Sequence, residues 1–463
     1  MSDNTNPSRF GSRFRRYKLG WMLLLPLAFL LAAVAYLAIP EWNAARANRS
    51  QFERWAATGV PYNDATLQQG YNERTNPAGA ADWIESTRLI RWGSEVEAYQ
   101  KLPYLGGESE EPANLVPGGN AKDWPGEPQV ASYLEEMEPV IDLIERASSY
   151  PTPVRFPIKF QGVGTLLPYL QDSRSILRLL SLDCDFAYFH QDNDRALRDL
   201  ALMKATAEAY DGREFLVSSL VNAALRSIRM SAIRQTLVHS QWSAAELKVL
   251  RDSLALEEEV STRWQDVMLR ERAFGMSAVG ESPNVLAQAT GQDTQFASQL
   301  KLYTGPLEVK TLIEAYQKII DITTGSDVSD WRKRASECEI WVKSQPSNSL
   351  AGMLTPAASA YLDAELRIEN SRRWTLTAVA IQEFKLQNER WPSELSELQT
   401  VGLVDTDYSD ADKNVFGYEI DGDKVFLWKQ NPTDNSKSHR ISKTRPLPDE
   451  KNKDISYCVV ELN

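Results

Sequence analysis

Four carboxylates near the C-terminus are the residues of this chain whose spacing most directly suggests chemistry. They stand at Asp405, Asp407, Asp410 and Asp412, and Asn414 adds another side-chain oxygen. Proteins bind Ca²⁺ through such hard oxygen ligands, so calcium is the one metal or cofactor that the sequence suggests. The loop is not an EF-hand, because the sixth position counted from Asp405 is aspartate instead of glycine. A solvated acidic turn is the favoured interpretation, and calcium binding is the alternative.

Charged residues in the middle of the chain offer two further candidate sites. An envelope hydrolase would have to assemble its site from scattered side chains, for which the candidates are Arg174, Arg178, Glu271 and Arg272. An anion site could be lined by Arg155, Lys159, Asp172, Arg174 and Arg178. Charges on amphipathic helices usually form solvated faces or structural ion pairs, so this ordinary interpretation is favoured for both groups. An enzyme is therefore the second hypothesis, not the first.

Other motifs that carry chemistry are missing from the sequence. It has no phosphate-binding loop and no His-Glu-x-x-His pair, and three histidines are too few to predict a metal site. Three cysteines, Cys184, Cys338 and Cys458, cannot form a disulfide framework, and we expect them to be buried apolar side chains. Apart from calcium, no cofactor is expected.

Residues 19–40 form an uncharged apolar run that is long enough to span a membrane. At 1.5 Å per residue, these 22 residues extend about 33 Å as a helix, against about 30 Å for a hydrocarbon core. Trp21 and Trp42 stand at its ends, where indoles favour the membrane interface, and five basic residues precede it. We therefore expect a single-pass anchor in the cytoplasmic membrane, with the N-terminus inside and the bulk of the chain extracytoplasmic. A signal peptide cleaved near Ala35 is the alternative.

The rest of the chain is acidic and apolar enough to fold. Residues 19–463 hold 46 basic and 62 acidic side chains, which argues against nucleic acid as a partner. Apolar residues make up 43% of the whole chain, so a real core is expected. The expected partners are the membrane, through residues 19–40, and a protein in the cell envelope.

Apolar residues recur at helical spacing through most of the chain, which predicts a mostly α-helical body. Two helices separated by the polar residues 191–194 form an expected αα-hairpin. Ser243 and Glu246 form a capping box that opens a long helix, expected to run to Met268. Pro139 stands inside another helix and is expected to kink or divide it.

Three segments have a different character. Three prolines within residues 150–160 forbid a helix, and apolar residues alternate there, so we expect an extended strap across the helical body. Residues 416–428 read as a β-hairpin that turns at Asp421-Gly422, and residues 456–462 are a candidate third strand. The expected fold class is thus mostly α, with an N-terminal transmembrane helix and a small α+β tail.

These elements divide the chain into five expected segments. They are a basic cytoplasmic N-terminus (1–18), a transmembrane helix (19–40), membrane-proximal helices with a Pro/Gly-rich linker (41–128), a helical domain (129–370), and a helix with a small β tail (371–463).

The tail resembles the C-terminal region of type II secretion pseudopilins. A helix leads to Trp391-Pro392, an acidic loop follows, and residues 416–428 form the hairpin. The resemblance implies that the calcium ligands of this loop are to be sought at Asp405, Asp407, Asp410 and Asp412. It also implies a secretion-associated component, in which helix 371–390 and the hairpin form a separable unit.

The middle of the chain looks like membrane-anchored envelope proteins of planctomycete-type bacteria. The segments that carry this resemblance are residues 153–158, 165–170 and 215–220. It implies a setting in the envelope but no activity. The leading hypothesis is therefore an extracytoplasmic helical protein that acts in protein interaction or scaffolding.

Overall fold

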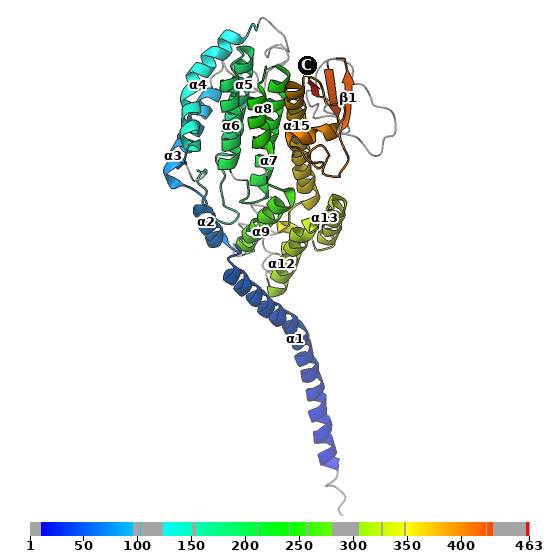
Figure 1. Cartoon of the computed structure of the whole chain (residues 1–463). Coiled ribbons are helices and arrows are strands. Elements are labelled where there is room, and N and C mark those ends of the chain that lie inside the picture. Colours follow the sequence, from blue (N-terminus) through cyan, green and yellow to red (C-terminus); the bar gives the residue numbers. More distant parts are fainter. Residues whose placement is uncertain are drawn as a thin grey trace, which may run out of the picture.

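A computed structural model of the chain describes most of its residues. The described residues are 11–95, 102, 124–150, 154–210, 212–239, 241–255, 258–279, 305–325, 327–346, 349–422, 424–428 and 460–462, without the side chains of 11–26, 92–95, 238–239 and 460–462. Within these ranges the chain is mostly helical, which confirms the expected fold class. One long helix, α1 (Gly11–Thr58), carries a body of packed helices at one end (Figure 1).

The helices of the body follow one another closely along the chain. The α-helices are α2 (Asp64–Asn72), α3 (Ala80–Glu95), α4 (Glu127–Ser148), α5 (Leu170–Phe189), α6 (Asn193–Ala209), α7 (Leu216–His239), α8 (Ala244–Ala255), α9 (Val260–Val279), α12 (Pro306–Ile320), α13 (Val328–Lys343), α14 (Leu350–Leu354) and α15 (Ala358–Asn388). Short 3₁₀ helices are η1 (Pro77–Gly79), η4 (Asp321–Thr323) and η5 (Leu395–Val401). The expected αα-hairpin is confirmed as α5 and α6, which pack side by side (Figure 1).

One expectation about helix boundaries is wrong, and a second is wrong in one of its two alternatives. The helix expected to run to Met268 is two helices, because α8 packs its leucines into the main core whereas α9 buries Trp264 in a second core. The capping box itself is present, since Ser243 and Glu246 each accept a hydrogen bond from the other's backbone N–H. Pro139 does not divide α4, whose buried residues on both sides of the proline hold it against the core.

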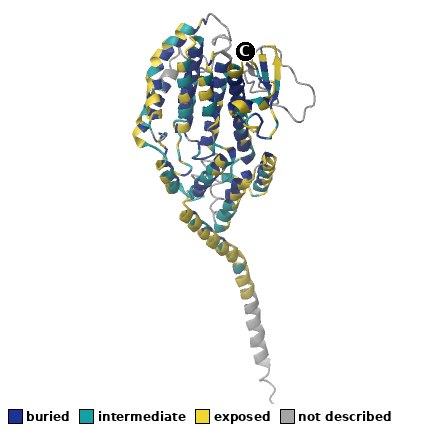
Figure 2. Cartoon of the chain, viewed as in Figure 1, coloured by how far each residue is buried: buried dark blue, intermediate teal, exposed yellow. Residues whose placement is uncertain are grey.

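Helix α15 joins the two cores. Its first half packs with α9 and α13 and shares the second core with α12, and its second half packs with α7, α8 and the tail. Figure 2 shows that the buried residues follow these central helices. The helical part of the segment 371–390 therefore belongs to the main core. The pseudopilin resemblance implied a unit separable from the body, and the packing of α15 does not agree with that.

The expected strap is present over residues 154–160. Val154, Phe156, Ile158 and Phe160 are buried, while the residues between them are more exposed. The backbone of the strap is hydrogen-bonded to its neighbours: Phe156 N–H donates to the Ala209 carbonyl at 3.2 Å, and the Tyr71 hydroxyl donates to the Phe156 carbonyl. The prolines prevent the strap from forming a helix, so its backbone groups form hydrogen bonds with neighbouring elements. These bonds connect the strap to α2 and to the end of α6.

The tail folds into a small antiparallel sheet of three strands, β1 (Gly417–Asp421), β2 (Lys424–Trp428) and β3 (Val460–Leu462), in the order β1-β2-β3. Asp421 pairs with Lys424 around Gly422, whose φ of +64° suits glycine. Gly417 faces Trp428, and a side chain at Gly417 would collide with the indole. The hairpin expected at residues 416–428 is thus confirmed. Val425 and Leu427 join it to the main core.

Helix α1 is apolar and exposed where it leaves the body. Within Leu27–Thr58, only 6% of the apolar window is buried, and Phe29, Tyr36 and Leu37 are at least 70% exposed. Figure 2 shows this exposed helix against the buried core. Such an apolar surface is stable only in an apolar surrounding. One N-terminal helix is therefore long and apolar enough to be a membrane anchor.

The last turns of α1 are fastened to the body. The Glu41 carboxylate accepts a hydrogen bond from Leu307 N–H at 3.0 Å, and the Asn48 amide donates to the Pro306 carbonyl at 2.7 Å. Both contacts lie at the N-terminus of α12, where a negative side chain is favoured. Farther along, the Arg272 guanidinium stacks 3.8 Å above the buried Trp55 ring. The body is thus held on the anchor by contacts along the helix.

Candidate functional site

The acidic loop uses its carboxylates for local hydrogen bonds. Asp405 accepts from the Gln399 amide at 2.8 Å, Asp407 from Val404 N–H at 2.9 Å, and Asp410 from Asn414 N–H at 2.8 Å. Asp412 forms an ion pair with Arg332 of α13. The four side chains therefore serve different partners.

Within the described part of the chain, no group of three His, Cys, Asp or Glu side chains is placed to hold a metal ion. The calcium site stays a prediction, which a calcium titration of thermal unfolding would test. Cys184 and Cys338 are buried free thiols, as expected, and Cys458 lies outside the described residues.

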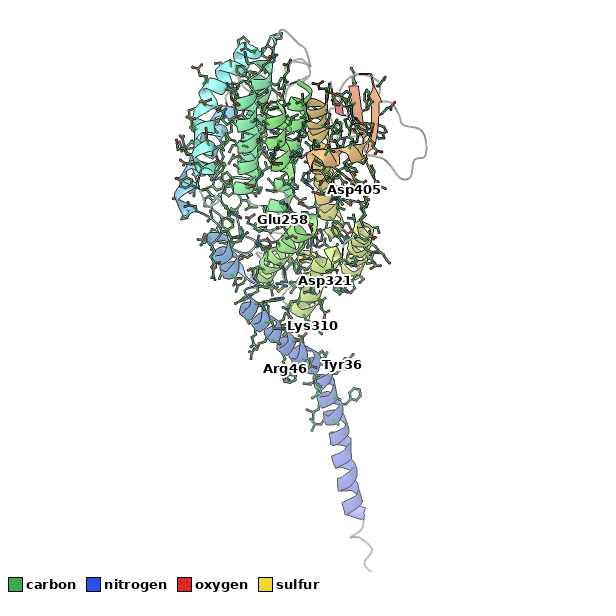
Figure 3. The ribbon with its side chains drawn as sticks, in the orientation of Figure 1. Tyr36, Arg46, Glu258, Lys310, Asp321 and Asp405 are labelled. Atoms are coloured by element: carbon green, nitrogen blue, oxygen red, sulfur yellow. The ribbon has the colours of Figure 1, made fainter. Side chains whose placement is uncertain are left out.

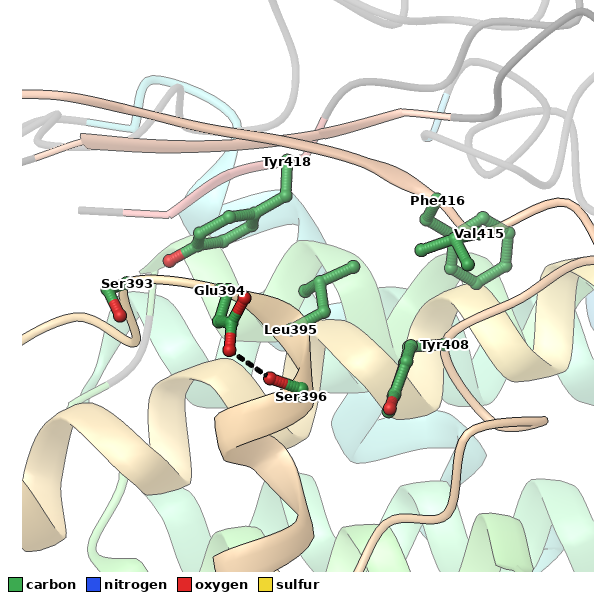
Figure 4. A pocket seen from close by; sticks show the side chains of 8 residues that line it. All are labelled: Ser393, Glu394, Leu395, Ser396, Tyr408, Val415, Phe416 and Tyr418. Atoms are coloured by element: carbon green, nitrogen blue, oxygen red, sulfur yellow. Dashed lines mark hydrogen bonds between the residues drawn. The ribbon is translucent and has the colours of Figure 1, made fainter.

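A shallow hollow lies beside this loop, between η5 and the start of β1 (Figure 4). Its volume is about 420 Å³, and its lining residues are Ser393, Glu394, Leu395, Ser396, Tyr408, Val415, Phe416 and Tyr418. Two of the polar groups are already bound, because Ser396 donates to Glu394 at 2.6 Å and Tyr418 donates to the Pro392 carbonyl at 2.6 Å. The hollow therefore combines polar side chains, of which these two are already hydrogen-bonded, with apolar and aromatic contact.

The four residues proposed for a hydrolase have separate roles. Glu271 accepts a hydrogen bond from Leu216 N–H at 2.7 Å, at the beginning of α7. Arg272, its neighbour, points to Trp55 of α1 and is buried there. Arg174 and Arg178 are partly exposed on α5. Glu271 and Arg272 thus hold helix ends in place, and these four residues do not converge on one site.

The residues proposed for an anion site are also divided. Asp172 is buried in an ion pair with Arg91 of α3, which is the structural pairing that the sequence favoured. Lys159 is exposed on the strap. Arg155, in contrast, turns toward charged residues from other elements. Arg155 and these charged residues form a dense group of ionisable side chains near the strap.

We call this group the arginine cluster. Its guanidinium groups are those of Arg74 from the turn after α2, Arg155 from the strap, Arg213 from the α6–α7 connection and Arg270 from α9. Its carboxylates are those of Glu214, Glu258 and Asp266. Arg213 pairs with Glu258 and with Asp266, each at 3.3 Å, and Arg270 pairs with Asp266 at 3.2 Å. Figure 3 marks Glu258 within the body, away from Asp405 in the tail.

Burial and mutual repulsion perturb the guanidinium groups. The pKa of Arg155 is lowered to about 10, chiefly by burial and then by the charge of Arg74. The pKa of Arg270 is also lowered to about 10, again chiefly by burial. Shifts of this kind show that several positive charges share one poorly solvated region. Clusters with perturbed pKa values are candidate functional sites.

Glu214 is the fully buried member of the cluster. Burial raises the pKa of its carboxyl group, and the positive charge of Arg155 opposes that rise. The nearby Ser218 hydroxyl, which donates to the Phe215 carbonyl at 2.7 Å, also opposes that rise. Among the described residues, neither carboxylate oxygen of Glu214 has a hydrogen-bond partner.

A tight turn places Glu214 and Tyr210 in this region. Gly212 has a φ of +72°, and a Cβ there would lie 2.3 Å from the Cβ of Asn222 on α7. Glycine is required for both reasons, since other residues would suffer backbone strain and a collision. Tyr210 is buried, and its hydroxyl likewise has no hydrogen-bond partner among the described residues.

Sequence reasoning found only part of this cluster. Arg155 was named for an anion site, but Arg74 and Glu214 come from segments far apart in the chain and carry no local motif. One feature of the sequence could have indicated this region. It is Gly212, which predicts a turn in a segment with charged residues between two apolar helices. Nothing in the spacing indicates that this turn meets α2, α9 and the strap.

No family model, curated protein or solved structure matches the chain. The resemblances to pseudopilins and to planctomycete-type envelope proteins therefore stay predictions.

Proposed function

We propose that the protein is a single-pass membrane protein whose helical body acts in protein interaction or scaffolding outside the cytoplasm. The observation that carries this proposal is α1, an exposed apolar helix that continues without interruption into the body and is hydrogen-bonded to α12. Such an anchor holds the body next to the membrane surface, where it could dock other envelope proteins.

The basic residues before the apolar run support an orientation with the N-terminus inside. Single cysteines at position 12 and position 333, in a chain whose native cysteines are replaced by alanine, test this with an impermeant maleimide. We expect labelling at position 333 in spheroplasts and labelling at position 12 only after lysis. Labelling of position 12 alone in intact spheroplasts would reverse the orientation.

The tail is the part of the body best suited to meet a protein partner. It lies at the end of the body away from α1 (Figure 1). Val415 lines the hollow and is 49% exposed, and Val404 in the same loop is 59% exposed. Apolar side chains at the rim of a hollow are common features of protein interfaces.

A photo-crosslinking amino acid at position 415 tests this surface in cells. We expect one discrete crosslinked species with position 415, and none with the matched exposed position Val249 on α8. Val415→Glu should remove the adduct formed from a probe at position 404, because a charge at the rim opposes apolar docking. Adducts that form equally at 249 and 415, or survive Val415→Glu, would count against a partner at the tail.

A further inference from the structure

We propose that the last turns of α1 lie on the bilayer surface and bind anionic phospholipid headgroups through Arg46 and Arg49. This inference rests on the proposed membrane anchor, and it adds a second contact between the protein and the bilayer. The surface involved is the side of α1 that is turned away from the body. We call it the lipid-facing stripe, and it consists of Trp42, Arg46 and Arg49.

The body covers only one side of these turns. The residues of α1 that are buried there or bonded to the body recur at a spacing of three or four, which places them on one face of the helix. They are Glu41, Ala44, Asn48, Phe52 and Trp55. Trp42, Arg46 and Arg49 recur at the same spacing, so they share a second face, turned away from the first. All three are exposed, and Trp42 is 64% exposed.

A bend in α1 brings this stripe toward the bilayer. Figure 1 shows that α1 changes direction before it reaches the body, so that its last turns pass beneath the other helices. Pro40 stands at the end of the apolar run, and a proline inside a helix removes a backbone hydrogen bond and bends the helix. The body lies on one side of the bent segment, so the opposite side faces the membrane.

The position of the stripe along α1 matches the headgroup region. At 1.5 Å per residue, Arg46 lies about 9 Å and Arg49 about 14 Å along the helix from Pro40. A bent helix rises less than its length, and the headgroup region is about 5–8 Å thick on each side of the bilayer. Long arginine side chains extend toward this region, and an indole such as that of Trp42 favours it.

The start of α12 lies at the same depth. Leu307 N–H donates to the Glu41 carboxylate at 3.0 Å, which fixes the first turn of α12 beside the end of the apolar run. Leu307 is 43% exposed in this position. An exposed leucine next to the membrane gains an apolar surrounding when the body rests on the bilayer.

The charge of the stripe fits an anionic headgroup. The last turns of α1 carry three basic and two acidic side chains, at Arg46, Arg49, Arg54, Glu41 and Glu53. Glu41 is turned toward α12, and Glu53 lies beyond Arg49, farther from the apolar run. Within the described part of the chain, Arg46 and Arg49 form no ion pair. Guanidinium groups bind phosphate oxygens through two parallel hydrogen bonds, and an anionic membrane surface attracts them.

Fluorescence quenching by spin-labelled lipids tests the stripe in the full chain. A single cysteine at the exposed position 50 carries a nitrobenzoxadiazole dye, in the chain whose native cysteines are replaced by alanine. Nanodiscs with one protein copy contain phosphatidylglycerol or phosphatidylcholine, at equal mole fraction, with a nitroxide near the headgroup. We expect phosphatidylglycerol to quench the dye more strongly, because the arginines concentrate it. Equal quenching by the two lipids would overturn the proposal. So would a lack of quenching by either, the result for a stripe that faces solvent and serves a protein partner.

A double variant tests whether the two arginines select the lipid. Arg46→Gln together with Arg49→Gln should reduce the preference of position 50 for phosphatidylglycerol about fivefold or more. The matched control, Lys333→Gln together with Arg367→Gln, removes two exposed positive charges from α13 and α15 and should leave the preference unchanged. A preference that survives the first pair of substitutions, or that both pairs reduce equally, would refute the role of the arginines.

A dye at position 34 separates this inference from the proposed anchor. Val34 lies inside the apolar run and is 55% exposed, so a nitroxide deep in the acyl chains should quench a dye there. The same nitroxide should not quench a dye at Val249 on α8. Quenching at position 34 without quenching at position 50 would refute the stripe and leave the anchor intact. A dye at position 34 that no lipid quenches would refute the anchor, and with it the stripe.

Discussion

Replacing Glu365 by alanine is expected to lower the free energy of unfolding by about 3–5 kcal/mol. Glu365 is fully buried on α15, and its carboxylate lies 3.4 Å from Arg226 of α7 and 3.8 Å from Arg263 of α9. The Ser219 hydroxyl lies 3.3 Å from the same carboxylate and 2.6 Å from the Tyr361 hydroxyl. Loss of the carboxylate leaves two buried positive charges without this counter-charge, which is far more costly than loss of an exposed pair.

The matched control is Asp363→Ala on the same helix. Asp363 pairs with Arg332 at 3.8 Å, but both side chains are more than 40% exposed, so a change below about 1 kcal/mol is expected. Chemical unfolding of the full chain in detergent, followed by circular dichroism, measures both. Equal losses for the two variants would show that the buried network contributes no more than a surface ion pair.

A combined variant distinguishes charge from packing. Arg226→Met together with Glu365→Met removes one buried pair and keeps most of the volume. Such replacements by apolar residues are often nearly neutral, so the double variant is expected to be more stable than Glu365→Ala. If the double variant is less stable than Glu365→Ala, the stability of the network depends on its hydrogen bonds to Ser219 and Tyr361 and not only on its charges.

These results bear on what the sequence could predict. Local sequence patterns predicted an element correctly where the residues of that element alone determine its structure. The strap formed because prolines exclude a helix and alternate residues are apolar, and the hairpin formed because Asp421-Gly422 accommodates a tight turn. The capping box at Ser243 likewise needs only its own two residues.

Patterns failed where packing between distant segments decides the outcome. The periodicity from residue 244 to residue 268 suits one helix as well as two, and only the existence of two separate cores makes α8 and α9 distinct. Helix α15 bridges those cores, so the domain boundary expected at residue 370 falls inside a continuous helix. Side-chain periodicity shows that a helix has a buried face but not which core receives it.

The candidate site illustrates the same limit in charged residues. Sequence reasoning treated Glu271 and Arg272 as neighbours in one site, but adjacent residues on a helix point about 100° apart. Glu271 therefore meets the start of α7, while Arg272 meets Trp55. The arginine cluster, conversely, joins residues that are far apart in sequence. Only the three-dimensional arrangement brings these residues together.

The second large effect is a pH dependence of stability that Glu271 introduces. Burial raises the pKa of its carboxyl group from 4.5 to about 7, although the hydrogen bond from Leu216 N–H opposes the rise. A folded-state pKa above the unfolded one stabilises the fold below about pH 4.5, and this contribution disappears as the pH rises through 7. The wild type should therefore lose on the order of 3 kcal/mol of unfolding free energy from this group between pH 4.5 and pH 8.

Glu271→Gln removes this titration and keeps an oxygen that accepts from Leu216 N–H. We expect the stability difference between the variant and the wild type to shift in favour of the variant as the pH rises from 5 to 8. Chemical unfolding at several pH values measures that difference. A difference that does not change with pH would mean that Glu271 is solvated well enough to ionise normally in the folded protein.

Glu369 provides an internal control, because its pKa is shifted in the opposite direction from that of Glu271. Burial alone would raise its pKa, but hydrogen bonds from Arg372 and Arg373 outweigh this effect and hold the pKa at about 2. The stabilisation of the fold by ionised Glu369 is fully present above pH 4.5, its pKa in the unfolded chain. This stabilisation is lost as the pH falls toward 2. Glu369→Gln should therefore change the acid side of the stability profile and leave the interval from pH 5 to 8 unaffected. If both variants altered the same interval, the pH dependence would come from the fold as a whole and not from these two carboxylates.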